Sequence, residues 1–115
     1  MDKEEWQQAE PGVKRRIFRP GDSIMMMEVH FESGAEGYEH DHSHEQLTYC
    51  LRGRFEFRIG GRPHPLEQGE TLFIPGGARH GVRALEAGAL LDAFTPLRAD
   101  LLRSSGWTDQ TVQDV

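Results

Sequence analysis

The sequence predicts an all-β domain made of short strands, arranged as a sandwich or a closed barrel. Thirteen glycines and six prolines interrupt the chain at short intervals, and this spacing suits strands and tight turns better than long helices. Several segments between them alternate apolar and polar residues, as half-buried strands do. A length of 115 residues accommodates one domain with a single core. Closure into a barrel would remove both sheet edges and would leave a mouth that can hold one ligand.

The first strands are expected between residues 13 and 32. Residues 1–12 are polar, and we expect them to form a flexible arm in which Trp6 can pack on the body or on a second subunit. Residues 13–18 predict a short strand that ends at a turn signal, Arg19-Pro20-Gly21-Asp22. Residues 24–32 alternate, which predicts a half-buried strand. Its apolar face consists of Met25, Met27, Val29 and Phe31.

The remaining strands follow a run of histidines. Gly60-Gly61 predicts a hairpin turn, and the two prolines in residues 62–66 belong on an edge strand. We expect the barrel to span residues 13–98, followed by a C-terminal tail, residues 99–115, with one short helical segment. The other expected strands cover residues 47–51, 54–59, 71–75, 80–85 and 88–95.

Composition and charge exclude several kinds of partner. A net charge of -6 and the lack of a long basic run argue against nucleic acid. No apolar run approaches the ~20 residues that span a bilayer, and the first residues lack the apolar core of a signal peptide. The single cysteine, Cys50, cannot form an internal disulfide, which suits a reducing compartment. We therefore expect a soluble cytoplasmic protein. Its one short basic cluster is interpreted as a solvated strand edge: Lys14, Arg15, Arg16 and Arg19.

Three histidines at alternate positions predict a metal site. His40, His42 and His44 share one face of an extended chain, and two such imidazoles can hold one ion. Gln46 has the same parity and can add its amide oxygen. Because a stable site takes three or four protein groups, a further ligand must come from elsewhere, and the obvious supplier is His80. The alternative interpretation is a polar loop with solvated histidines.

Two motifs in this part of the chain resemble those of the cupin family. The first family motif is G-x5-H-x-H-x3-E-x6-G, and it is matched by Gly34, His40, His42 and Gly53, with Gln46 at the glutamate position. The second is G-x5-P-x-G-x2-H-x3-N, and it is matched by Gly69, Pro75, Gly77 and His80, with Ala84 in place of the asparagine. The resemblance implies a single-domain double-stranded β-helix, the jelly-roll barrel of cupins, with a metal inside.

By this resemblance the metal ligands are His40, His42, Gln46 and His80. Such a donor set suits one divalent transition metal, Ni, Zn, Fe, Mn or Co. An amide oxygen cancels none of the ion's charge, so the ion should be a stronger Lewis acid than with a carboxylate ligand. The amide is also a weaker ligand. His44 falls outside the motif spacing and is expected to be a structural partner near the rim, with a ligand or substrate contact as the alternative.

A narrower resemblance points to the KdgF-type cupins of pectin degradation. It is carried by E-G-Y-E-H-D-H-S-H-E-Q, G-R-F-E-F and L-L-D-A-F-T-P-L-R-A-D. It implies an enzyme that converts 4,5-unsaturated uronate monosaccharides, released by pectin and alginate lyases, to the linear 4-deoxy-5-keto-uronate without redox chemistry. Resemblance to single-domain cupins also implies a homodimer.

Three residues near the end of the barrel are candidate catalytic residues. Asp92 interrupts an apolar strand, so it is either buried beside the metal, where it can transfer a proton, or turned to solvent. Phe94 shares its face and can stack on a sugar ring. Arg98 can hold the substrate carboxylate through two parallel hydrogen bonds, or can be a surface residue. Arg79, beside His80, is the reserve carboxylate contact.

Two other functions remain open because fold does not fix function. One is a metal-dependent dioxygenase or isomerase acting on another small molecule. The other is a non-catalytic sugar-binding cupin, against which the complete ligand set and Asp92 argue.

Overall fold

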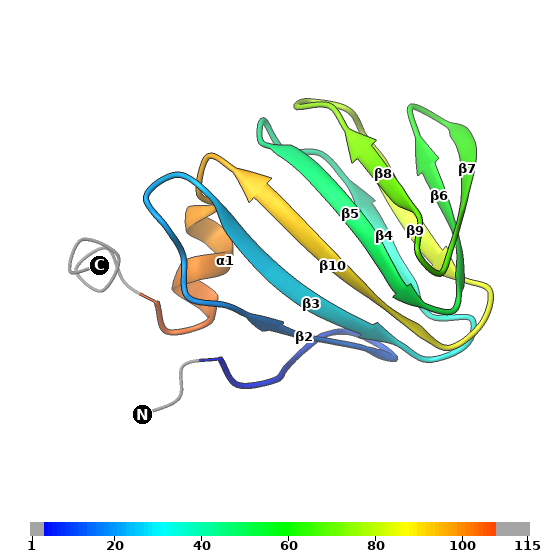
Figure 1. The fold of residues 1–115 in the computed structure, drawn as a ribbon, viewed down its shortest axis with the longest axis horizontal. Helices are drawn as coiled ribbons and strands as arrows, with labels where there is room; N and C mark the ends of the chain where they lie inside the picture. The colour runs from blue at the N-terminus through cyan, green and yellow to red at the C-terminus, as the bar shows by residue number, and fades with distance from the viewer. Residues whose placement is uncertain (1–3, 108–115) are drawn as a thin grey trace.

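Two antiparallel sheets form the two layers of the fold (Figure 1). The computed structural model describes residues 4–107. The larger sheet contains, in spatial order, β1 (Gln7–Glu10), β2 (Val13–Ile17), β3 (Met25–Phe31), β10 (Gly88–Thr95), β5 (Glu45–Arg52) and β8 (Thr71–Ile74). The smaller sheet contains β4 (Glu36–His40), β9 (His80–Ala84), β6 (Arg54–Ile59) and β7 (Arg62–Glu67). The prediction of an all-β jelly roll is confirmed.

The core lies between the sheets and contains the apolar faces predicted from alternation. Strand β3 buries alternate residues beginning at Met25 and exposes or half-buries those between them. Phe31 of β3 meets Phe55 of β6 edge to face, with ring centroids 5.2 Å apart. Burial of each such side chain contributes about 1.5–3 kcal/mol. These contacts join the two sheets and fix the width of the space between them.

Strand β1 corrects the expectation of a wholly flexible N-terminal arm. Gln7 pairs with Arg15 and Gln8 with Lys14, so this polar segment forms backbone hydrogen bonds with β2. The tight connection is possible because Gly12 takes a positive φ of 75°. Alternation of apolar residues could not reveal this strand, because Ala9 is the one apolar residue in it.

A short helix, α1 (Ala99–Ser104), lies where the sequence predicts a helical segment. Its Leu101 and Leu102 are buried. Among residues 4–107, no helix is long and apolar enough to cross a membrane. The ends of the expected arm and tail, residues 1–3 and 108–115, lie outside the described residues.

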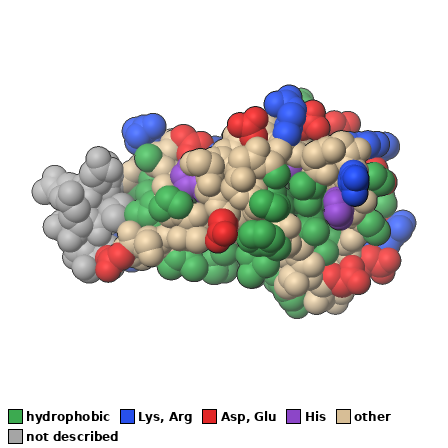
Figure 2. All heavy atoms as spheres, turned by 90° about the horizontal axis from the view of Figure 1, so that it is seen from above, with side chains coloured by type: hydrophobic (Ala, Val, Ile, Leu, Met, Phe, Trp, Pro, Cys, Tyr) green, Lys and Arg blue, Asp and Glu red, His purple; other side chains and the backbone are tan. Residues whose placement is uncertain are grey.

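Within strand β5 the polar Gln46 and Thr48 point inward, whereas the apolar Leu47 points outward. Gln46 and Thr48 are 5% and 0% exposed, whereas Leu47 is 52% exposed. In Figure 2 hydrophobic side chains also gather along the middle of one face of the molecule. Gln46 and Thr48, which point inward, therefore line a polar part of the interior. The outer face of the larger sheet carries one row of cross-strand neighbours, the outer apolar row: Met26, Ala93, Leu47 and Phe73.

Candidate metal centre and active site

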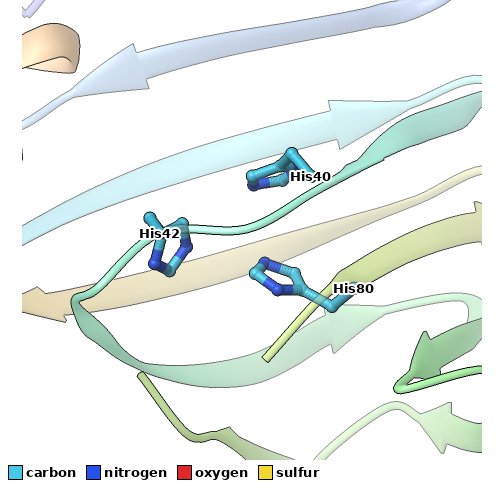
Figure 3. A group of neighbouring side chains, drawn as sticks. All are labelled: His40, His42 and His80. Carbon is cyan, nitrogen blue, oxygen red and sulfur yellow. The ribbon is translucent and has the colours of Figure 1, made fainter. Parts of the chain in front are cut away.

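Three histidines converge between the sheets (Figure 3). His40 ends β4 and His80 begins β9, and the antiparallel pairing of these strands sets the two residues directly opposite each other. His42 comes from the loop after β4. One ring nitrogen of each lies within 4.8 Å of the others. The fold thus brings together two segments that are far apart in the sequence, as the motifs imply.

Each of these three rings is held by a hydrogen bond at Nδ1. A carbonyl oxygen can only accept, so Nδ1 carries the proton and donates. In a neutral ring this leaves the Nε2 lone pair free to bind a metal, an arrangement typical of metal-binding histidines. The acceptors are the carbonyl oxygens of Tyr38 for His40 (2.8 Å), of His44 for His42 (3.0 Å) and of Ala78 for His80 (2.9 Å).

Two features of these rings fit a bound cation. The Nε2 atom of His80 is buried and has no hydrogen-bond partner among the described residues, a costly state for a polar atom. Burial is the main cause that lowers the pKa of His80, to about 4, with the nearby His40 and His42 adding to the effect and the Ala78 hydrogen bond opposing it. The His80 ring is therefore neutral at physiological pH, and the lone pair of its Nε2 atom is unsatisfied.

The second feature that fits a bound cation is the contact between His42 and Gln46. Its Oε1 atom lies 3.2 Å from Nε2 of His42, while Nδ1 of His42 already donates to a carbonyl. Burial, followed by the charge of Arg98, lowers the pKa of His42, and a neutral imidazole cannot donate from both nitrogens. The two facing atoms are therefore both acceptors, and a cation between them would satisfy both. Three imidazoles and one amide oxygen fit a divalent transition ion.

Asp92 lies inside the same region, as the burial alternative predicts. It is 6% exposed, and its Oδ1 accepts a 2.7 Å hydrogen bond from Oγ1 of Thr48, its cross-strand partner. Burial raises the pKa of Asp92 to about 6, and the hydrogen bonds to Thr48 and Gln46 and the charges of Arg98 and His40 partly offset this effect. Such a carboxyl can both accept and release a proton near neutral pH.

Phe94 and Arg98 lie beside these groups. The Phe94 ring packs edge to face against His42, with centroids 5.7 Å apart. The Arg98 guanidinium carbon lies 4.9 Å from the centre of the Phe94 ring, and Nη2 of Arg98 forms an ion pair of 2.8 Å with Asp100. A cavity of about 430 Å³ is lined by His40, Gln46, His80, Asp92, Phe94 and Arg98. Its volume is in the range of small-molecule sites.

Two other candidates from the sequence lie elsewhere. Arg79 does not line this cavity; it forms an exposed ion pair of 3.0 Å with Glu39, so it loses its place as the reserve carboxylate contact. His44 is half-buried and is not one of the three clustered histidines. It contributes its carbonyl, which orients His42.

Sequence reasoning missed two residues of the cavity region. Thr48 bridges Gln46 and Asp92, and its parity with Gln46 on one strand was the available signal. Arg15 lines the cavity, although the basic cluster to which it belongs predicts a solvated strand edge. The signal there was its alternation with Val13 and Ile17, both of which are buried.

Comparison with known proteins agrees with this geometry. A cupin domain model matches residues 27–94. The pectin degradation protein KdgF of Dickeya dadantii is 40% identical over 103 residues, which cover 88% of this chain and 94% of that protein.

Solved structures give the same result. The structure of KdgF from Halomonas matches with a TM-score of 0.80 and 36% identity, over 85% of this chain and 91% of that one. An RmlC-like cupin from Shewanella frigidimarina matches with a TM-score of 0.80 and 33% identity, over 84% and 87%. On the evidence of its two motifs, its paired sheets and these matches, the chain belongs to the cupin family.

Proposed function

We propose that this cupin converts 4,5-unsaturated uronate monosaccharides to the linear 4-deoxy-5-keto-uronate with the help of one divalent metal ion. Its likeness to the pectin degradation protein KdgF of Dickeya dadantii supports the substrate class. The observation that carries the proposal is the presence of Asp92, buried and with a raised pKa, in the same cavity as His40 and His80. The reaction needs a proton donor and acceptor in such a place.

The metal ligands in this proposal are His40, His42, Gln46 and His80. The bound ion, Ni, Zn, Fe, Mn or Co, would supply Lewis-acid polarisation of a substrate oxygen. The three rings are already oriented by carbonyl hydrogen bonds, so little reorganisation is needed on binding. Gln46 contributes no negative charge, which leaves the ion's full charge to act on the substrate.

The chain's own residues would bind the sugar and move the proton. Arg98 attracts the substrate carboxylate, and Phe94 offers a face for the ring. The hemiacetal C1–O5 bond breaks as the C1 hydroxyl gives its proton to Asp92, which yields an aldehyde at C1 and an enolate at C5. The enolate then receives that proton at C4 and becomes the C5 ketone. Asp92 accepts and returns this proton, so the reaction is an isomerisation with no net gain or loss of protons or electrons.

Loss of the substrate's ultraviolet absorbance tests the proposal directly. The wild type should consume the unsaturated uronate. Asp92→Asn should be slower by about 100-fold or more, the scale of general acid–base contributions, and His40→Ala should also be much slower, because it removes a metal ligand. Arg79→Gln is the matched control, because Arg79 adjoins His80 in sequence but lies outside the cavity, and it should keep the wild-type rate. Unchanged rates in both Asp92→Asn and His40→Ala would contradict the proposal. Oxygen uptake by iron-loaded protein would instead indicate a dioxygenase.

We also propose that the protein is a cytoplasmic homodimer. Leu47 and Phe73 are each 52% exposed and are neighbours on adjacent strands, and an apolar surface of this kind is often covered by a partner. Trp6, the other candidate contact, packs on His30 of the same chain, with ring centroids 4.4 Å apart. A second copy that covers the outer apolar row would leave the cavity between the sheets free. The free and buried Cys50 suits a reducing compartment.

A further inference from the structure

Arg15 projects into the protein although its neighbours in sequence project outward. On β2, Val13 and Ile17 are buried in the core, and Arg15 shares their face. Lys14 and Arg16 take the other face, where both approach the ring of Trp6. An arginine between two core residues is costly to bury. Its position therefore indicates a function that offsets this cost.

The guanidinium of Arg15 is held in place by neutral groups. Its Nε donates to Oε1 of Gln7 at 3.0 Å, and its Nη2 lies 3.5 Å from Oγ of Ser104. In the described part of the chain, no carboxylate forms an ion pair with it. Asp100 and Glu10 influence it only at longer range. Arg15 thus carries a positive charge that its own protein does not pair.

Arg98 lines the same cavity as Arg15, but unlike Arg15 it forms an ion pair. Both Arg15 and Arg98 line the cavity that also contains His40 and His80, but Arg98 already has one carboxylate partner, because Asp100 accepts hydrogen bonds from its Nε and Nη2. Burial and the charge of Arg98 both lower the pKa of Arg15. Two guanidiniums that repel each other, one of them unpaired, create a place where an anion would relieve the repulsion.

We propose that Arg15 and Arg98 together form a clamp for the substrate's carboxylate. The inference rests on the proposed function, because the anion it names is the uronate carboxylate. Arg15 supplies the unpaired charge and Arg98 the second donor, and Gln7 and Ser104 hold Arg15 in place for contact. The clamp makes a carboxylate at this position a condition of tight binding, so neutral sugars of the same shape should bind weakly.

Kinetics of a matched pair of variants test the clamp. Arg15→Gln should raise KM for the unsaturated uronate about tenfold or more, the scale of a lost hydrogen bond to a charged group, with kcat within about twofold of wild type. Arg15→Lys, which keeps the charge, should recover part of the loss. Arg16→Gln changes the adjacent, outward arginine and should leave KM unchanged. Thermal unfolding of each variant shows that it is folded. An unchanged KM in folded Arg15→Gln would overturn the clamp.

Calorimetric binding of D-galacturonate and D-galactose separates this inference from the proposed reaction, because it needs no turnover. Wild type should bind galacturonate more tightly than galactose, and Arg15→Gln should lose that preference while Arg16→Gln keeps it. If Arg15→Gln loses the preference for galacturonate but the wild type does not consume the unsaturated uronate, the clamp is supported and the proposed function is contradicted. Turnover without any Arg15-dependent preference would support the function and overturn the clamp. Equal loss of both sugars in Arg15→Gln would also overturn it.

Discussion

Thr48 donates a hydrogen bond of 2.7 Å to Asp92 and accepts one of 3.0 Å from the amide of Gln46. A hydroxyl has one proton, so donation to the carboxylate obliges Thr48 to accept from Gln46. The Gln46 amide nitrogen is thereby turned toward Thr48, and its oxygen faces His42. One side chain thus links the candidate proton carrier to a candidate metal ligand.

Replacement of this threonine should weaken metal binding without unfolding the protein. Thr48→Val has a similar shape but no acceptor, so the Gln46 amide loses the contact that fixes its oxygen toward the histidines. We expect metal affinity, measured by competition with a chromogenic chelator, to fall about tenfold, which corresponds to 1.4 kcal/mol. Thr48→Ser keeps the hydroxyl and is the control that should stay near wild type. Equal affinity in Thr48→Val and wild type would show that the hydrogen bond does not orient Gln46.

Asp92 should make the metal-free protein less stable as the pH rises. Its pKa in the folded chain, about 6, is above the ordinary value of 3.8, so the folded state binds the proton more tightly than the unfolded state. The contribution of Asp92 to the free energy of unfolding should therefore decrease between about pH 4 and 6, by up to about 3 kcal/mol. His80, whose pKa is lowered to about 4, contributes a change of the opposite sign over this range. Urea unfolding of chelator-treated wild type and Asp92→Asn at several pH values measures the Asp92 contribution as the difference between the two proteins.

Asp92→Asn is the comparison that assigns the slope to this carboxyl. The amide does not ionise, so the free energy of unfolding of the variant relative to wild type should rise by up to about 3 kcal/mol between about pH 4 and 6, and the variant should be the more stable protein at pH 7. Asp41→Asn changes an exposed aspartate near the histidines and should keep the wild-type slope. If Asp92→Asn and wild type unfold with the same pH dependence, the carboxyl is not destabilised by burial.

Much of the fold and of the histidine site could be predicted from particular residues. The alternation that begins at Met25 predicts the inward face of β3, and motif spacing pairs His40 and His42 with His80 across the sheet. β1 could not be predicted in this way, because its polar residues are held by backbone pairing with β2. Arg15 was missed because a run of like charges indicates a solvated surface, whereas strand geometry sends alternate members to opposite faces.

The outer apolar row should mediate self-association. Leu47→Glu places a charge at the centre of this row, next to Phe73, and burying it between two subunits would be costly. We expect the variant to elute as a monomer with light-scattering detection while the wild type elutes as a dimer. Leu85→Glu, at an exposed position outside the larger sheet, is the control and should remain dimeric. A wild type that is monomeric at all concentrations tested, or a dimeric Leu47→Glu, would rule out this interface.

Gln46→Glu should bind metal more tightly and work more slowly. The substitution restores the glutamate of the family motif, and a carboxylate oxygen would cancel part of the ion's charge, which an amide cannot do. Metal affinity measured by chelator competition should increase about tenfold or more, while the ion becomes a weaker Lewis acid and kcat for the unsaturated uronate falls. The two effects have opposite signs, so a general disturbance of the site, which would lower both quantities, is distinguishable. Higher affinity with an unchanged kcat would show that the neutral ligand is not what sets the rate, and lower affinity would show that Gln46 is not a ligand.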